Sequence, residues 1–505
     1  MRSFWFLVAF TAQPLAAQAE PVITRAANTI TPQDIMHRLG LIAADSMQGR
    51  GTPSAGLERT AEYVASEFKS AGFAPGGGDG TYIQRFAVTR WVIDTYSSTV
   101  NLAANGKRAA VRIGTDARYV LGKVPDGPVS APVLLIAPGA DSSTPLAGPD
   151  VRGKLVLLVA DFSQPLPSTF NQQIVELGQA GPTAILILSN RDSTTFAQRL
   201  FVAARPRLEL DAEYGSESGA PVVEVHERAL GPVLGAMGID PVRLRMMRQA
   251  QRRGIPGLAI EVRLSSRVLV RARVPNVVGI LEGTDSALRR EYLVYSAHID
   301  HIGITPGQAD SVNNGADDNA SGVAGLLELA EAFTQPGMRP KRSIVFLAPG
   351  AEEDGLLGSA HFTQNPTVPL RQVVANINMD LIGRNWPDSV IAVGMEQSDL
   401  GKTLQSVVRM HPELRMTPIA DRWPEERIFY RSDHYNFARK GVPILFFTSG
   451  THPDYHQPSD EAAGINGEKQ TRLVRLLFYL GVRLADTMAR PQWNAASYAQ
   501  IVDRK

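Results

Sequence analysis

The sequence offers its clearest chemistry in residues 343–359, SIVFLAPGAEEDGLLGS. The apolar run 344–348 has the length and bulk of a buried strand. A Pro-Gly break follows it, and then two adjacent glutamates, Glu352 and Glu353. Because ligands of α/β sheets bind outside the carboxyl ends of the strands, one glutamate could bind a metal ion while the other transfers protons. Taken alone, the segment fits an acidic surface loop better than a site, because acidic loops mostly lie on the surface.

The region from residue 274 onward must position these carboxylates. Strands are expected at 292–296, 344–348, 373–379 and 443–448, each a short apolar run. Between the first two, a helix after Ser321 carries Val323, Leu326 and Phe333 on one face. Such alternation of strands and helices predicts an α/β sheet. Seven of the nine histidines, His298 to His456, fall in this region.

Each predicted strand ends in side chains that could bind a metal ion. In chain order these are His298, Asp300 and His301; then Glu352 and Glu353; then Asp380; then His452, Asp454 and His456. The loop before the helix adds Asp317 and Asp318. Imidazole and carboxylate ligands suit Zn²⁺, with Mn²⁺ or Co²⁺ as substitutes. Several carboxylates and histidines together could hold two ions bridged by one carboxylate, which activates a water and a carbonyl.

Five motifs carry a resemblance to a known family: AHIDH at 297–301, GADDNASG at 315–322, AEEDGLLGS at 351–359, NMD at 378–380 and YHQPSD at 455–460. In this order they resemble the motifs of the M28 family of di-zinc aminopeptidases, over about residues 274–490. The resemblance implies a zinc-exopeptidase fold, which is α/β with a mixed, mostly parallel sheet flanked by helices. It also implies a metalloexopeptidase that releases N-terminal residues from peptides and uses two Zn²⁺ ions per chain.

The same resemblance implies a role for each matching residue. The implied metal ligands are His298 and Asp380 for one zinc ion, Glu353 and His456 for the other, and Asp318 as the bridge. Glu352 matches the general base, and Asp300 matches the acid that orients the His298 ring. Tyr455 matches a tyrosine that polarises the scissile carbonyl, unless it merely packs its loop. The remaining acids and histidines nearby are expected to support the site: His301, Asp317, Asp433, His434 and His452.

Four segments are expected along the chain. Residues 1–19 read as a signal peptide, with Arg2, a short apolar core and an Ala-Gln-Ala cleavage pattern. Residues 29–92 resemble the first part of the peptidase domain; they hold a helix around 57–68, and their turn-rich stretch 45–51 fits a site mouth or an ordinary loop. Residues 95–268 read as an inserted β-rich module that resembles a protease-associated domain, and residues 274–490 as the catalytic domain.

Within the inserted module, the pattern predicts short strands separated by turns and a single helix at 172–180. The expected strands cover 133–136, 154–159, 184–188 and 222–225. The module contains almost no histidine, so no chemistry of its own is expected.

The composition narrows the class of protein. A net charge of +1 over 505 residues gives no global attraction to nucleic acid. The absence of cysteine excludes disulfides and thiolate ligands. No apolar run is long enough to span a membrane. The signal-peptide pattern and the resemblance together imply a bacterial protein of the periplasm or the exterior, whose partners are peptides with a free N-terminus.

Three other interpretations stay open beside the aminopeptidase, two of them enzymes and one a binding protein. A dinuclear carboxypeptidase would need arginines for the substrate carboxylate, and Arg384 and Arg431 lie near motifs. A glutaminyl cyclase would hold one zinc ion, which the presence of His298 and Asp380 argues against. A non-catalytic binding ectodomain would have lost ligands or the base, and this sequence keeps both.

Overall fold

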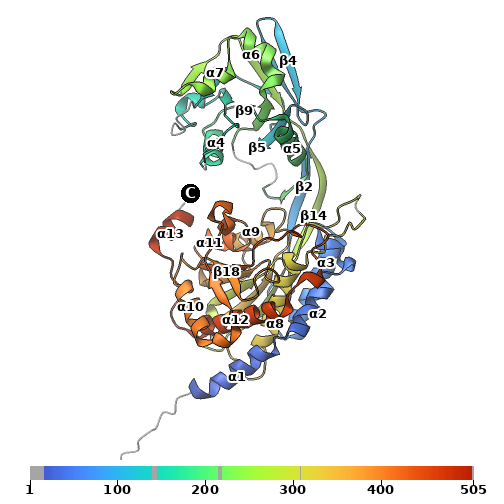
Figure 1. The fold of residues 1–505 in the computed structure, drawn as a ribbon, viewed down its shortest axis with the longest axis vertical. Coiled ribbons are helices and arrows are strands. Elements are labelled where there is room, and N and C mark those ends of the chain that lie inside the picture. Colours follow the sequence, from blue (N-terminus) through green and yellow to red (C-terminus); the bar gives the residue numbers. More distant parts are fainter. Residues whose placement is uncertain (1–15, 139–144, 168, 214–218, 308, 503–505) are drawn as a thin grey trace, which may run out of the picture. The chain divides into compact units, whose positions relative to one another are not determined.

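The computed structural model describes residues 16–138, 145–167, 169–213, 219–307 and 309–502. Two compact units make up the chain: Met1–Phe86 with Arg273–Lys505, and Ala87–Ala272 (Figure 1). The chain passes from one unit to the other inside β2 (Ile83–Ile93) and again inside β14 (Ser266–Leu281). The predicted signal peptide lies outside the described residues up to residue 15, and its last four residues begin helix α1 (Ala16–Thr29).

The first unit is built on a mixed sheet. Its strands lie in the order β14, β16 (Ser343–Ala348), β15 (Tyr292–Ser296), β17 (Val373–Met379), β20 (Ile444–Thr448), β18 (Ser389–Val393) and β19 (Thr417–Ile419). The four strands β16, β15, β17 and β20 are parallel to one another. β14 runs antiparallel to β16, and β18 runs antiparallel to β20 and parallel to β19. A short strand, β1 (Ala74–Pro75), pairs with β14. The predicted α/β fold with a mostly parallel sheet is confirmed.

Helices cover both faces of this sheet (Figure 1). On one face lie α9 (Leu357–Gln364) and α11 (His434–Ala438), and on the other lie α8 (Gly322–Phe333) and α12 (Gly467–Asp486). Successive residues of a strand point to opposite faces, so β15 supplies both cores. Val294 belongs to the apolar cluster with α9 and α11, whereas the Tyr295 ring lies 6.2 Å from that of Phe333 in α8. Two further helices of this unit are α10 (Leu400–Met410) and α13 (Ala495–Ile501).

The N-terminal segment adds two helices to this unit: α2 (Pro32–Ile42) and α3 (Ala55–Ser70). The helix expected around residues 57–68 is therefore present as α3, and Gly72 follows its end with a φ of +81°. A second helix, α2, precedes it, and the sequence analysis did not predict this helix. Its start carries ordinary signals, since Thr31 caps the backbone N–H of Asp34 and a proline opens the helix.

The second unit contains two sheets. One has the order β12 (Gln251–Gly254), β7 (Val133–Ala137), β8 (Leu155–Val159), β9 (Ala184–Ser189), β11 (Val222–His226) and β5 (Ala117–Leu121). The other has the order β4 (Lys107–Arg112), β3 (Thr99–Ala104), β13 (Ala259–Arg263) and β6 (Val129–Ser130). A further strand, β10 (Arg207–Leu210), pairs with β2. The four strands expected from the sequence are β7, β8, β9 and β11.

The expectation of a single helix in the second unit is wrong. Besides α4 (Phe170–Gln179), the structure has α5 (Ser193–Ala203), α6 (Gly231–Ala236) and α7 (Pro241–Met246). Asp192 and Asp240 cap two of these helices, so the N-terminal signals were present in the sequence. Two of the missed helices span only six residues, which is too short for a helical period to show in the sequence.

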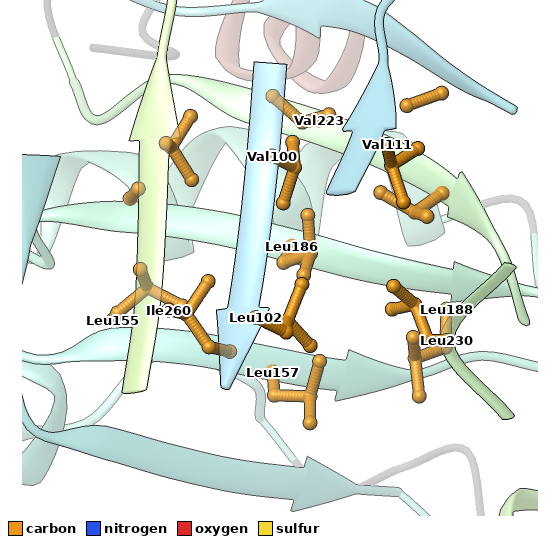
Figure 2. Close-up of a cluster of buried hydrophobic side chains, with 14 of the residues drawn as sticks. Val100, Leu102, Val111, Leu155, Leu157, Leu186, Leu188, Val223, Leu230 and Ile260 are labelled. Atoms are coloured by element: carbon orange, nitrogen blue, oxygen red, sulfur yellow. The ribbon is translucent and has the colours of Figure 1, made fainter. Parts of the chain in front are cut away.

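An apolar core lies between the two sheets of the second unit. Figure 2 shows Val100 and Leu102 of β3 among Leu157 of β8 and Leu186 of β9, and all four are buried. The alternation of strand residues brings these side chains to the inner faces of both sheets. The second unit therefore has a hydrophobic core of its own. In the described part of the chain, no helix combines the length and the apolar character needed to cross a membrane.

Candidate metal centre

The candidate site lies where the parallel strands of the first unit end. His298 follows β15, Glu353 follows β16, Asp380 follows β17, and the loop with His456 follows β20. Because these strands are parallel neighbours, their carboxyl ends meet at one edge of the sheet. The tight turn 316–321 at the start of α8 brings Asp318 to the same edge.

Three residues form a first group of potential ligands. The Nε2 atom of His298 lies 3.3 Å from Oδ1 of Asp318 and 3.3 Å from Oδ1 of Asp380. All three side chains are buried. Ser432 donates a hydrogen bond of 2.8 Å to the other oxygen of Asp380, which leaves Oδ1 facing the group.

A second group shares Asp318 with the first. Nε2 of His456 lies 3.1 Å from Oδ2 of Asp318 and 3.2 Å from Oε2 of Glu353. His301 joins this group through an Nδ1 to Oε1 distance of 2.8 Å to Glu353. Asp318 thus presents one carboxylate oxygen to each group, which is the arrangement a bridging ligand requires.

The residues in both groups fit divalent metal ions. Nε2 of His298, Nε2 of His456 and Oδ1 of Asp380 are buried without a hydrogen-bond partner. Buried polar atoms in proteins normally have a partner, so these atoms indicate that each group binds a ligand of its own. Nitrogen and oxygen atoms that bind one tetrahedral zinc ion lie about 3.3 Å apart, close to the spacing seen here. Among the described residues, both groups of potential metal ligands lie in the first unit.

Asp300 organises the loop that carries the two glutamates. Its Oδ1 accepts the backbone N–H of Glu352 at 3.0 Å, and its Oδ2 accepts that of Glu353 at 3.2 Å. Nδ1 of His298 bonds the backbone carbonyl of Asp300 at 3.2 Å and lies 3.7 Å from its Oδ1. Asp300 therefore contacts the His298 ring chiefly through its main chain, while its carboxylate fixes the direction in which the glutamate loop leaves β16.

The charges in the site perturb one another strongly. Burial raises the pKa of Glu352 well above its usual value; nearby His298 opposes this effect, and Asp380 adds to it. Burial would also raise the pKa of Asp318, but hydrogen bonds from His298 and His456 hold that pKa well below its usual value. Perturbed groups of this kind are typical of functional sites. Glu352 thus differs from Asp318 in the direction of its shift, whereas burial raises the pKa of Asp380 as it does that of Glu352.

Tyr455 and Glu352 lie beside the ligand groups. The Tyr455 ring stacks on His456 with a centroid distance of 3.9 Å. Burial raises the pKa of Tyr455, so its hydroxyl stays protonated and can donate a hydrogen bond. Both residues line a cavity of about 340 Å³ that also contacts Asp318, Glu353 and His456. The sequence placed neither residue among the metal ligands, and neither belongs to the two groups.

Sequence reasoning missed His301 as a member of the second group. The signal was the spacing in AHIDH, which repeats a histidine three positions after His298. Gly315 makes room for this ring, because a Cβ atom there would lie 2.5 Å from Cδ2 of His301, and its φ is +56°.

Asp460 is a second residue that the sequence left without a role. Its Oδ2 accepts the backbone N–H groups of Asp317 and Asp318 at 2.9 and 3.2 Å. It therefore joins the loop that carries His456 to the loop that carries Asp318. His452 and Asp317 also lie behind the ligand groups, with 3.4 Å between Nε2 and Oδ2.

Comparisons with known proteins agree with this geometry. Residues 276–480 match the sequence profile of Peptidase family M28. The chain is 24% identical over 337 residues to Aminopeptidase YwaD of Bacillus subtilis (strain 168), over 63% of this chain and 60% of the relative. It is 26% identical over 262 residues to a "Probable zinc metalloprotease" of Pyrenophora tritici-repentis (strain Pt-1C-BFP), over 46% of this chain and 59% of the relative. The chain thus spans about three fifths of the length of both curated relatives.

A solved structure is similar in fold. The aminopeptidase from Aneurinibacillus sp. strain AM-1 aligns over 93% of this chain and 97% of its own, with a TM-score of 0.55 and 17% identity. At that identity the likeness concerns the fold alone. The profile match covers all the strands and turns that carry the two ligand groups. The match to Peptidase family M28 thus concerns residues 276–480, the part of the chain that carries both ligand groups.

Proposed function

We propose that this protein is a di-zinc aminopeptidase that hydrolyses the first peptide bond of peptides with a free N-terminus. One observation carries the proposal: Asp318 presents its two oxygens to two separate groups of histidine and carboxylate ligands at the wall of a cavity. The names of two relatives, an aminopeptidase and a probable zinc metalloprotease, support the same activity.

Each group of ligands would hold one ion. His298 and Asp380 would bind the first, Glu353 and His456 the second, and Asp318 both; His301 is a further candidate for the second. Bound zinc supplies Lewis acidity, which polarises a carbonyl and lowers the pKa of water. The ligand atoms without hydrogen-bond partners support this assignment.

The protein's own groups would move the protons. Glu352 accepts a proton from the attacking water and returns it to the leaving amine. Its pKa is raised, first by burial, which makes its carboxylate a stronger base than an exposed glutamate. The Tyr455 hydroxyl donates a hydrogen bond to the negative oxygen that develops on the substrate carbonyl.

The charge of the cavity favours a substrate ammonium group over a substrate carboxylate. Beyond the ligand carboxylates, Glu352 and Glu426 line the cavity, while Arg431 is its arginine. Arg431 pairs with Glu426 at 3.3 Å, and Arg384 pairs with Asp454 at 2.6 Å. Because both arginines have acidic partners, a carboxypeptidase is the weaker proposal.

A glutaminyl cyclase and a binding ectodomain also have less support. A cyclase that holds one zinc ion does not need the first group of metal ligands. In this protein, however, Nε2 of His298 and Oδ1 of Asp380 lie 3.3 Å apart, and neither atom has a hydrogen-bond partner. A binding ectodomain needs no buried base, yet Glu352 lines the cavity with a raised pKa. We further propose that the protein is exported through residues 1–19, and that Ala87–Ala272 forms a protease-associated domain inserted in the peptidase.

A substrate panel tests the proposal. The zinc-loaded protein is assayed on three sets of substrates. The first set is aminoacyl-arylamides, the second is peptides with N-acetyl groups, and the third is peptides with amidated C-termini. An aminopeptidase cleaves the first and third sets and fails on the second. Cleavage that requires a free C-terminus would instead establish the carboxypeptidase. Conversion of an N-terminal glutamine to pyroglutamate on the intact peptide, with release of ammonia, would establish the cyclase.

A further inference from the structure

Arg50 is a buried arginine that lies far from the metal-ligand motifs in sequence. It is 1% exposed and ends the turn Asp45–Arg50, which lies outside the residues that match the family profile. A buried guanidinium is costly unless its donors are satisfied. The partners of this side chain therefore indicate what it does.

All five N–H groups of Arg50 donate to backbone carbonyls. Nε donates to Ile299 at 3.0 Å. Nη1 donates to Asn314 at 2.6 Å and also to Ile42 at 3.0 Å. Nη2 donates to Gly315 at 2.9 Å and also to Asp318 at 3.3 Å. Ile299 lies directly after the ligand His298, so one planar group joins the two loops that supply His298 and the bridging Asp318.

The main chain around Arg50 joins the same loops. The backbone N–H of His301 donates to the carbonyl of Arg50 at 3.3 Å, and that of Gly303 donates to Gly49 at 3.0 Å. Gly49 has a φ of +61°, and a Cβ atom there would lie 2.5 Å from two carbonyl oxygens. The backbone of residues 49–50 therefore packs directly against the backbone of the loops that follow His298.

Asn314 makes an independent link between the same parts. Its Nδ2 donates to the carbonyl of Ala43 at 2.7 Å and to Oδ1 of Asp45 at 2.9 Å. The sequence alone did not decide whether the turn-rich stretch 45–51 is a site mouth or an ordinary loop. In the structure, the side chains of Arg50 and Asn314 join this stretch to residues 299–318.

We propose that Arg50 is a positioning residue that holds the loops of His298 and Asp318 at the separation needed to bind two metal ions. Lysine cannot replace it, because an ammonium group offers three donors and no planar fork. The inference rests on the proposed di-zinc site. It assigns a role in that site to the N-terminal segment, which precedes the second unit in the chain.

The test compares Arg50→Lys with Arg342→Lys. Arg342 is equally buried and donates to the backbone carbonyls of Leu484 and Met488, at 2.7 and 3.0 Å. It directly precedes β16, whereas Glu352 follows the other end of that strand, so it is a matched arginine remote from the ligands. Zinc affinity of the metal-free proteins is measured by titration against a chelating dye, together with kcat, KM and thermal melting.

Arg50→Lys should weaken the binding of at least one zinc ion by about 10–100-fold and lower kcat with little change in KM. Arg342→Lys should lower the melting temperature and keep wild-type zinc affinity. If Arg50→Lys does not fold, Asn314→Ala removes the second link and should weaken zinc binding to a smaller extent.

Two results would overturn the inference. One is wild-type zinc affinity in the folded Arg50 and Asn314 variants, and the other is a wild-type protein that binds no zinc. The proposed aminopeptidase activity can fail separately. In that case the wild-type protein binds two zinc ions, Arg50→Lys weakens their binding, and no aminoacyl substrate is cleaved.

Discussion

The carboxylate of Asp300 accepts the backbone N–H of Glu352 at 3.0 Å, so the position of the proposed base depends on an acid that follows a different strand. The second oxygen of Asp300 holds Glu353 in the same way. With both amides fixed, Glu353 faces the second ligand group while Glu352 lines the cavity.

Asp300→Asn should separate this positioning from metal binding as such. An amide can accept only one of the two N–H groups, because its NH₂ would face the other donor. We expect kcat to fall by about 10–100-fold, as for other residues that orient ligands. Steady-state kinetics and metal analysis on the same preparations provide the measurement. Unchanged kcat would show that the glutamate loop needs no such anchor.

Single substitutions in the two groups should have different effects on metal content. Asp380→Ala and His456→Ala should each leave about one ion per chain, because each residue faces one group. Asp318→Ala should reduce the binding of both ions. Elemental analysis after dialysis against zinc gives the counts. Two ions in Asp380→Ala, or loss of both in each single variant, would argue against two groups joined by one carboxylate.

The cavity predicts a preference for bulky apolar N-terminal residues. Trp423, Ile428, Phe446 and Leu381 line it beside the ligand groups. Trp423→Ala should lower kcat/KM for leucyl- and phenylalanyl-arylamides by about 10-fold or more, since apolar contacts set such selectivity. Alanyl-arylamide is the internal control and should change little. An equal loss on all three substrates would mean that Trp423 supports the fold instead of contacting the side chain.

His434 predicts a loss of stability in acid. Burial lowers its pKa to about 3, and its Nε2 contacts the carbonyl of Phe429 at 2.9 Å. Below pH 6.5 the unfolded chain binds a proton that the folded chain does not, so stability falls as the pH falls toward 3. At pH 5 this group costs about 2 kcal/mol relative to neutral pH.

The measurement is denaturant unfolding of the metal-free proteins at pH 7.5 and pH 5. Wild type should lose more stability between these pH values than His434→Gln does, by about 2 kcal/mol. The comparison of the two proteins cancels the titration of the carboxylates that both contain. An equal loss in both proteins would mean that His434 is protonated in the fold.

The central sheet could be predicted because its strands are short, continuous apolar runs, the pattern of strands buried on both faces. For the same reason the ends of β15, β16, β17 and β20 could be located to within one residue. The ligand atoms follow directly from those ends. The helices of six residues and the edge strand Thr417–Ile419 are too short to show a helical period or a continuous apolar run, and the sequence analysis missed them.

Contacts between distant segments could not be predicted in the same way. Arg50 binds carbonyls up to 268 residues away, and nothing in a turn-rich stretch indicates which backbone it meets. Similarly, the sequence gives Asp300 a place beside His298, but only the folded chain brings its carboxylate to the amides after β16. Residues that act through backbone hydrogen bonds leave no spacing pattern to recognise.

Replacing each of the two adjacent glutamates in turn tests the central claim most directly. Glu352→Gln keeps the shape of the side chain and removes its basic oxygen. We predict two bound zinc ions, wild-type melting and little change in KM, with kcat lower by about 10²–10⁴-fold. Glu353→Gln, the matched control one residue away, should lose zinc from the group with His456. Near-normal turnover or loss of zinc in Glu352→Gln would contradict the assignment of base and ligand.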